Sequence, residues 1–218
     1  MKASTILNIV LALALAIVCA KMAYGSNSAE KEKTEEKSAG DDGNATKSHG
    51  AFKEFYINED FNENAFNYFM KGGGLILAAG DKEKSNAMTI GWGGIGQLWR
   101  KKVVTVYVAK GRYTHQFMEK TKYFTIMEFK DRNVAKYMGS HSGRDEDKAA
   151  ALGLHTAYTE NGTPYYEEAD MVIECRLMYK DEFNPSNFTD DVPRDFYKDF
   201  SPGLHSLYIG EVVSAMKK

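Results

Sequence analysis

Three short segments contain the residues with the clearest chemical use. They are Asn-Ala-Met-Thr-Ile-Gly-Trp from Asn86 to Trp92, Arg-Tyr-Thr from Arg112 to Thr114, and the run from His141 to Lys148. Together they supply hydroxyl groups, two arginines and a lysine. Such side chains bind phosphate oxygens through charge-assisted hydrogen bonds. The sequence therefore favours an anion site assembled from three separate parts of the chain.

The first segment extends this interpretation to a planar heterocycle that carries the phosphate. The Asn86 amide both donates and accepts hydrogen bonds, as the pyrimidine edge of a flavin requires, and the Thr89 hydroxyl can bind ribityl or phosphate oxygens. Backbone groups of residues 88–90 can complete the same edge. The alternative is that Asn86–Trp92 is simply one strand of a sheet, and its residues alone leave both interpretations open.

The two arginines also have two interpretations. Each guanidinium can contribute about 1.5 to 3 kcal/mol through a charge-assisted hydrogen bond to phosphate. Alternatively, Arg112 and Arg144 are ordinary solvated charges, and Arg144–Lys148 is the start of a helix in which Asp145 is favoured by the helix dipole. Ser142 and Lys148 strengthen the phosphate interpretation, because they add a hydroxyl and a third cation to the same segment.

Two glycine-containing motifs suggest other chemistry but lack the necessary context. Gly91–Gly96 matches the G-x-G-x-x-G pattern, yet Gln97–Lys102 leads into a strand, whereas a dinucleotide site needs a helix that begins within the glycines. Gly139–Gly143 contains Ser-His-Ser, but its glycines lack the spacing of a nucleophile elbow, and the segment lies between helical stretches. We therefore expect neither a Rossmann site nor a serine hydrolase.

Histidine and cysteine spacing gives no support for a metal site. The five histidines form no pairs three or four residues apart, and Cys175 has no partner once an N-terminal leader is removed. An intramolecular disulfide is therefore not expected. Cys175 lies inside the strand expected at Met171–Tyr179, between Glu174 and Arg176, and a buried structural thiol is expected there in preference to a redox-active one.

Short strands and a few helices must position these residues. The strands are expected at Leu75–Ala79, Asn86–Trp92, Val103–Ala109, Tyr123–Phe129, Met171–Tyr179 and Leu207–Ala215, where β-branched and aromatic residues concentrate. The helices are expected at Glu63–Phe69, Thr114–Lys120, Arg132–Gly139 and Asp145–Leu152. Thr114 and Asp131 are candidate N-caps. Since strands and helices do not alternate regularly, the pattern predicts a mainly β, antiparallel barrel with short peripheral helices.

The N-terminus has the pattern of an export signal. Lys2 precedes an apolar run from Ile6 to Ala20, and Ala23–Gly25 has the small-x-small form that signal peptidase cleaves. Residues 1–25 are therefore predicted to be a signal peptide, which places the protein in the periplasm or outside the cell. A lipid-modified Cys19 is the alternative, although Val18 occupies a position that favours a small residue.

Composition divides the rest of the chain into a linker and one domain. Residues 26–50 contain no aromatic or large aliphatic residue and are expected to form a disordered, charged linker. Residues 51–218 are long enough for one sizeable core. The apolar run from Ile6 to Ala20 is shorter than the ~20 residues that usually span a bilayer, and no other part of the sequence approaches that length, so no membrane-embedded domain is expected.

The charge balance argues against nucleic acid as a partner. The chain has 28 basic and 30 acidic residues, a net charge of −2, and removing Lys2 and Lys21 with the signal peptide changes −2 to −4. A nucleic-acid surface needs a basic excess or a basic stripe.

The order of the motifs resembles that of the flavin reductase-like, FMN-binding split-barrel family, which includes the flavoredoxins. The resemblance runs from about Phe66 to Met216. Its motifs are N-x-M-T-I-x-W, R-Y-T, H-S-G-R-D-x-D-K, E-C-R at Glu174–Arg176 and Y-I-G-E-V-V at Tyr208–Val213. The resemblance implies a six-stranded antiparallel split barrel of Greek-key type. It also implies a homodimer with one FMN at each of two sites near the subunit interface.

The resemblance assigns roles to individual residues. Asn86, Met88 and Thr89 are expected to contact the ring and ribityl chain, and the phosphate is expected to be held by Arg112, Thr114, Ser142, Arg144 and Lys148. Two features depart from the usual pattern. Gly93–Gly96 replaces a bulkier loop and is expected to make the surroundings of the ring more mobile. The export signal is the other, because reductases of this family generally work in the cytosol.

These observations predict an exported FMN-dependent oxidoreductase of flavin reductase type, which transfers electrons through bound FMN. Free reduced nicotinamides are not expected outside the cytoplasm, so a redox partner protein or a quinone is the expected exchange partner. One alternative is a non-catalytic flavin-binding electron carrier or binding protein. Another is a structural or small-ligand barrel that has lost the flavin.

Overall fold

The computed structural model describes residues 52–54, 68–69 and 74–218. The predicted signal peptide, the predicted linker and most of the predicted helix Glu63–Phe69 lie outside these residues. In the part of the chain that is described, no helix is long and apolar enough to cross a membrane.

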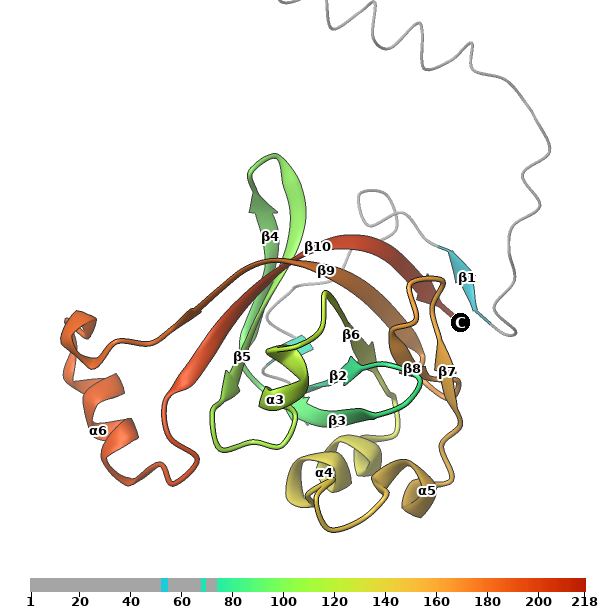
Figure 1. The fold of residues 1–218 in the computed structure, drawn as a ribbon, viewed down its shortest axis with the longest axis horizontal. Coiled ribbons are helices and arrows are strands. Elements are labelled where there is room, and N and C mark those ends of the chain that lie inside the picture. Colours follow the sequence, from blue (N-terminus) through green and yellow to red (C-terminus); the bar gives the residue numbers. More distant parts are fainter. Residues whose placement is uncertain (1–51, 55–67, 70–73) are drawn as a thin grey trace, which may run out of the picture. The chain divides into compact units, whose positions relative to one another are not determined.

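Antiparallel strands form the body of the domain (Figure 1). Within the described residues, one eight-stranded sheet has the order β3-β2-β6-β9-β10-β5-β4, and β1 pairs with β10. The strands are β1 (Lys53–Glu54), β2 (Leu75–Gly80), β3 (Ser85–Ile90), β4 (Gly93–Leu98), β5 (Lys101–Ala109), β6 (Tyr123–Glu128), β9 (Met171–Glu182) and β10 (His205–Lys217). Six of them match the predicted strands, with shifts of a few residues at most boundaries.

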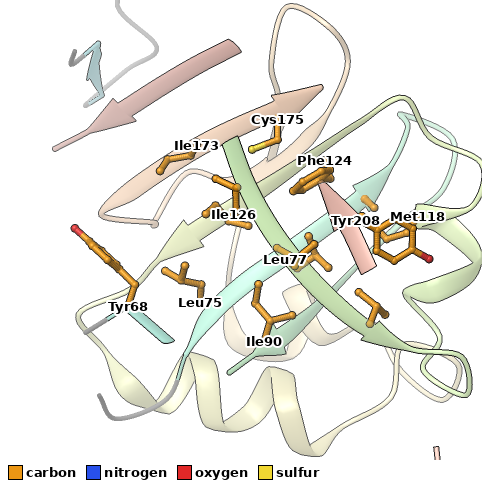
Figure 2. Packing of buried hydrophobic residues seen from close by; sticks show 14 of the residues in the cluster. Tyr68, Leu75, Leu77, Ile90, Met118, Phe124, Ile126, Ile173, Cys175 and Tyr208 are labelled. Atoms are coloured by element: carbon orange, nitrogen blue, oxygen red, sulfur yellow. The ribbon is translucent and has the colours of Figure 1, made fainter. Parts of the chain in front are cut away.

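The sheet curls into a barrel around one apolar interior. Side chains from β2, β3, β5, β6, β9 and β10 meet there, including Leu77, Ile90, Phe124 and Ile173 (Figure 2). β3 and β5 approach each other across this core but form no hydrogen-bonded ladder, so the barrel is split between them. The prediction of a mainly β, antiparallel split barrel is confirmed, but the described sheet has eight strands where six were expected, because β1 and β4 are added. Cys175 is buried in the same interior, as predicted, and burial raises the pKa of its thiol.

Helix α4 (Arg132–Ser140) covers the outer face of the sheet near β2 and β3. Its buried Val134, Ala135 and Met138 join Ile76 and Ala78 of β2 in a second apolar cluster. The predicted N-cap of this helix is confirmed, since the Asp131 carboxylate accepts a hydrogen bond from the Asn133 amide. This packing fixes the C-terminal end of α4 beside β3.

Two helix starts differ from the sequence prediction. Thr114 precedes α3 (His115–Met118), but its side chain makes no capping hydrogen bond and instead bonds Asn86. Helix α5 (Lys148–Leu152) begins three residues later than expected, because Asp147 is the residue that caps it, through the amides of Ala149 and Ala150. The segment before Asp147 is thereby released to form a loop.

The prediction of a mobile glycine loop is wrong, because Gly93 and its neighbours form strand β4, which pairs with β5. A Cβ at Gly93 would lie 2.3 Å from the Phe69 ring, so glycine permits close packing at this position. Trp99 and Arg100 join β4 to β5 with φ values of 50° and 59°. Such two-residue turns usually contain Asn-Gly, and a Trp-Arg turn therefore carries no sequence signal for a hairpin.

A second group of elements was not expected from the sequence. A small sheet of β7 (Thr156–Tyr158) and β8 (Pro164–Tyr166) precedes β9. Strands β9 and β10 extend as two arms, and between them lie a 3-10 helix (η1, Pro185–Asn187) and α6 (Asp191–Asp199), at the far end from β1 (Figure 1).

Candidate functional site

All eight residues predicted to bind the cofactor line a single cavity of about 330 Å³. They are Asn86, Met88, Thr89, Arg112, Thr114, Ser142, Arg144 and Lys148. The cavity lies between β3, the turn that precedes α3, the end of α4 and the loop that precedes α5. Its size falls within the range of about 300 to 1,000 Å³ that is typical of small-molecule sites.

Strand β3 presents an open backbone edge to this region, because it pairs with β2 on one side only. The Ala87 carbonyl points away from β2, since it accepts a hydrogen bond from the Lys148 ammonium at 2.7 Å. Backbone groups alternate sides along a strand, so the N–H and C=O of Thr89 point the same way as those of Ala87. Those of Met88 and Ile90 point toward β2. The backbone groups of residues 88–90 were predicted to meet the heterocycle. Among these, the groups of Thr89 are the ones that face the open edge.

Asn86 is held tightly at one wall of the cavity. Its side-chain nitrogen donates a hydrogen bond of 2.7 Å to the Thr114 hydroxyl, which is almost completely buried. A Cβ at Gly143 would lie only 1.9 Å from the Asn86 side-chain oxygen, so only glycine fits against this amide. The contact between Asn86 and Gly143 brings the first and third predicted segments together, and Thr114 adds the second.

The side chains of Met88 and Thr89 are also fixed. Thr89 donates its hydroxyl proton to the Ala135 carbonyl of α4, so the hydroxyl oxygen can act toward a ligand only as an acceptor. Met88 packs against the interior of the barrel. Both residues thus border the cavity from a rigid strand.

The two arginines are less constrained than the strand residues. The Arg112 side chain is exposed, and it has no hydrogen-bond partner among the described residues. Arg144 lies over the Tyr113 ring, with 5.0 Å between its guanidinium carbon and the ring centroid, and donates to the Gly111 carbonyl at 3.3 and 3.4 Å. Bonds of this length are weak. Both guanidinium groups can therefore turn to an anion at little cost.

Lys148 has a second role that the sequence did not indicate. Its ammonium is buried and donates to the carbonyls of Ala87 on β3 and Met138 on α4, at 2.7 and 3.1 Å. Burial lowers the pKa of this lysine to about 8; the nearby Glu146 raises it and Arg112 lowers it. Because an ammonium has three protons, one remains for an anion in the cavity.

Several lining residues were not among the predicted ligands. Tyr113 and His141 lie within the predicted segments but were given no role, and Gly111, Met138, Ser201 and Pro202 lie outside them. Ser201 and Pro202 belong to the segment after α6, and the Pro202 carbonyl accepts a hydrogen bond from the Gly111 amide at 2.8 Å. A contact between positions so far apart in the chain has no local sequence signal. The arginine-tyrosine-threonine motif could have suggested Tyr113, since an aromatic ring commonly supports a guanidinium.

A neighbouring cavity has the opposite electrostatic character. It has a volume of about 420 Å³ and shares a wall with the first at Asn86, Gly143, Arg144 and Lys148. Three consecutive carboxylates, Asp145–Asp147, line this second cavity. Among the described residues, the first cavity is lined by two arginines and a lysine and by no carboxylate. An anionic ligand is therefore favoured in the first cavity and disfavoured in the second.

The donor set of the first cavity suits a flavin phosphate. Three cations, the Ser142 hydroxyl and the Thr114 hydroxyl surround the polar end, and the open edge of β3 offers one N–H and one C=O at Thr89. A pyrimidine ring needs both a donor and an acceptor along its edge. The residues present therefore fit the group that the sequence resemblance implies.

Comparisons with known proteins identify the family and the fold of the chain. The model of the flavin reductase like domain matches residues 68–217. A flavoredoxin from Methanosarcina acetivorans has a similar structure (TM-score 0.51, 22% identity, 66% of this chain and 67% of that chain). So do an FMN-binding domain of a flavin reductases-like enzyme from Shewanella baltica (0.54, 18%, 76% and 76%) and the flavoredoxin of Desulfovibrio vulgaris (0.51, 25%, 66% and 68%).

No curated protein matches the chain at a significant level. The family model nevertheless covers well over half of the chain and the whole of the barrel from β2 to β10. It also includes all of the residues that line the candidate cavity. The chain therefore belongs to the flavin reductase-like family.

Proposed function

We propose that the protein is an exported, FMN-dependent oxidoreductase of flavin reductase type. The observation that carries this proposal is the cavity with three cations and, among its described lining residues, no carboxylate, next to the open edge of β3. A flavin with a terminal phosphate needs these two features side by side. Neither feature by itself would distinguish FMN from a simple anion or from an uncharged heterocycle.

Each end of the cofactor has its own set of residues in this proposal. Arg112, Arg144 and Lys148 hold the phosphate together with the hydroxyls of Ser142 and Thr114. The backbone N–H and C=O of Thr89 hold the pyrimidine edge. Asn86, fixed between Thr114 and Gly143, and Met88 border the ring.

Bound FMN supplies the ability to take up a hydride or single electrons. The chain contributes position and electrostatic stabilisation. A backbone N–H at the pyrimidine edge stabilises negative charge that develops there, and the rigid β3–α4 contact through Thr89 and Ala135 keeps this donor in place. No side chain is needed as a covalent catalyst.

Export, dimer formation and the electron partner belong to the same proposal. The apolar run and cleavage pattern of residues 1–25 support export. The family resemblance supports a homodimer. Since reduced nicotinamides are not freely available outside the cytoplasm, a redox partner protein or a quinone is the proposed exchange partner.

The proposal is tested with the purified mature domain loaded with FMN. A flavin spectrum that remains after gel filtration is the first expected result. The loaded protein is then mixed with NADH or NADPH without air. Rapid bleaching of the flavin identifies a nicotinamide-dependent reductase. An unchanged spectrum is expected when a redox partner protein or a quinone exchanges electrons with the FMN instead, in an oxidoreductase or in a non-catalytic carrier. A protein that stays colourless with excess FMN contradicts both.

FMN affinity is expected to depend on pH through Lys148. The pKa of about 8 means that the ammonium is charged below pH 8 and loses its third proton above it. The favourable contact with phosphate is therefore present below pH 8 and lost as the pH rises through it. We expect FMN affinity to fall about threefold to tenfold between pH 7 and pH 9, since about one tenth of the lysine stays protonated at pH 9 in the free protein.

Fluorescence titration of FMN at several pH values measures this dependence. Riboflavin, which lacks the phosphate, is the control ligand, and its affinity is expected to change much less over the same range. An equal change for both ligands would show that another group controls the titration.

A further inference from the structure

A cluster of aromatic rings lies beside the cavity, and its members come from α6, from the chain that follows α6, and from Trp92 between β3 and β4. Trp92 packs on Phe196 and on His205, with centroid distances of 5.1 and 4.7 Å. Phe200 completes the cluster, because it lies 4.8 Å from Phe196 and 5.3 Å from His205. Among these four, each ring touches two others, and Tyr197 adds a fifth ring 5.1 Å from Phe196.

One side of this cluster is open to solvent. Trp92 is 45% exposed, Phe196 is 40% exposed and Val192 is 76% exposed. Val192 and Phe196 are four residues apart on α6 and so share one face of the helix. We call the exposed surface of Trp92, Val192 and Phe196 the aromatic platform. No residue of α6 is buried, so packing in the hydrophobic core does not explain the presence of these apolar side chains.

The aromatic platform adjoins the cofactor cavity along two paths. Phe200 is followed directly by Ser201 and Pro202, which line the cavity. Trp92 follows Thr89 by three residues, which corresponds to about 10 Å at the rise of an extended chain. A ring held on the Thr89 edge of β3 would therefore have the platform within a distance suited to electron transfer.

The charges around the platform point to an uncharged occupant. On α6, Arg194 pairs with Asp191 and Lys198 pairs with Asp195, so four of the five charges of the helix cancel locally and Asp199 lies outside these pairs. Burial, together with the nearby Arg112, lowers the pKa of His205 to about 4, and the imidazole beneath the platform is neutral at physiological pH. Its Nδ1 bonds the Tyr197 hydroxyl at 2.8 Å.

We propose that the aromatic platform is the subsite for the electron acceptor, and that the acceptor is a planar, uncharged quinone that stacks on Trp92 and Phe196. This assignment rests on the proposed function, since it places the acceptor next to bound FMN. Two electrons would pass from the reduced cofactor to the quinone. The quinone would take up two protons from solvent, so that its two carbonyls become hydroxyls, and the cofactor would release its two protons to solvent. The cofactor is reduced beforehand by an electron-donating protein.

The binding part of the proposal is tested without flavin. The chain has two tryptophans, Trp92 and Trp99, so Trp99→Phe leaves Trp92 as the single tryptophan, whose emission is excited selectively at the red edge of its absorption band, where tyrosine does not absorb. Titration of this apo variant with 2-methyl-1,4-naphthoquinone is expected to quench Trp92 saturably. Adding Phe196→Ala is expected to weaken quinone binding at least fivefold. Adding Tyr179→Ala is the matched control, because Tyr179 is also 40% exposed but lies on β9 and touches Trp99 instead.

A second measurement follows electron transfer in the FMN-loaded protein after reduction with dithionite. Phe196→Ala is expected to slow reoxidation by the quinone at least fivefold and to leave reoxidation by ferricyanide, which needs no stacking, unchanged. Linear quenching that Phe196→Ala does not alter would overturn the proposal. So would Trp92 fluorescence that changes with protein concentration instead of with quinone, because a second copy of the chain would then cover the platform. A chain that quenches saturably but binds no FMN retains the subsite and loses the proposed function, so the two failures are distinguishable.

Discussion

Replacing both Arg112 and Arg144 by alanine is expected to weaken FMN binding about 100-fold, because each charge-assisted hydrogen bond to phosphate contributes about 1.5 kcal/mol or more and tenfold corresponds to ~1.4 kcal/mol. Both side chains border the cavity, and neither makes a strong bond elsewhere among the described residues. Quenching of FMN fluorescence on titration with apoprotein measures the affinity.

Two controls separate phosphate binding from general effects of charge. Arg100→Ala combined with Arg194→Ala removes two exposed arginines that do not line the cavity, and we expect unchanged FMN affinity. Riboflavin binding should be nearly the same in the wild type and in the Arg112/Arg144 double variant. If the double variant binds FMN as tightly as the wild type, the arginines are solvated surface charges and the site has been assigned wrongly.

Lys148→Met is expected to lower the free energy of unfolding by roughly 2 to 4 kcal/mol, because two buried carbonyl groups each lose a hydrogen bond, at about 1 to 3 kcal/mol apiece. The lysine connects Ala87 of β3 to Met138 of α4, so its loss loosens the contact that shapes the cavity. Urea denaturation of the apoprotein measures the change. Lys136→Met, an exposed lysine on α4, is the matched control and is expected to have a small effect.

The pH dependence of stability provides an independent check on Lys148. Its folded pKa of about 8 lies below the ordinary value of 10.5. Between these two pH values the unfolded chain keeps a proton that the folded chain has lost, so wild-type stability rises with pH across this window. A neutral amine still has two protons for the two carbonyls. Lys148→Met should lack this rise, and a parallel pH profile for both proteins would contradict the assignment.

The sequence predicted the parts of the fold that depend on local pattern. Six strands rich in β-branched and aromatic residues, the cap at Asp131 and the three binding segments could all be identified from neighbouring residues. Strand β4 could not, because its turn consists of Trp99 and Arg100 in left-handed conformations that these residues rarely adopt. The local conformational preferences of these two residues therefore do not predict the turn between β4 and β5.

Other parts of the site depend on contacts between distant residues. The charge of Lys148 suggested a phosphate ligand, but its two backbone acceptors become visible only when β3 and α4 are placed side by side. Thr114 was expected to cap a helix, yet its hydroxyl accepts a hydrogen bond from the Asn86 side-chain nitrogen instead. Ser201 and Pro202 reach the cavity only because β9 and β10 carry α6 back toward the turn at Gly111. Such contacts depend on how the strands and helices are connected and packed, and neighbouring residues in the sequence do not predict them.

The unpaired side of β3 has a consequence for the protein before it acquires a cofactor. An exposed strand edge is a template on which another chain can add a strand, and this leads to domain swapping or aggregation. The Lys148 ammonium blocks this template at the Ala87 carbonyl, and a heterocycle on Thr89 would block the next position. Occupancy would thus protect solubility as well as enable redox chemistry, and the cofactor-free chain would be the form most prone to self-association.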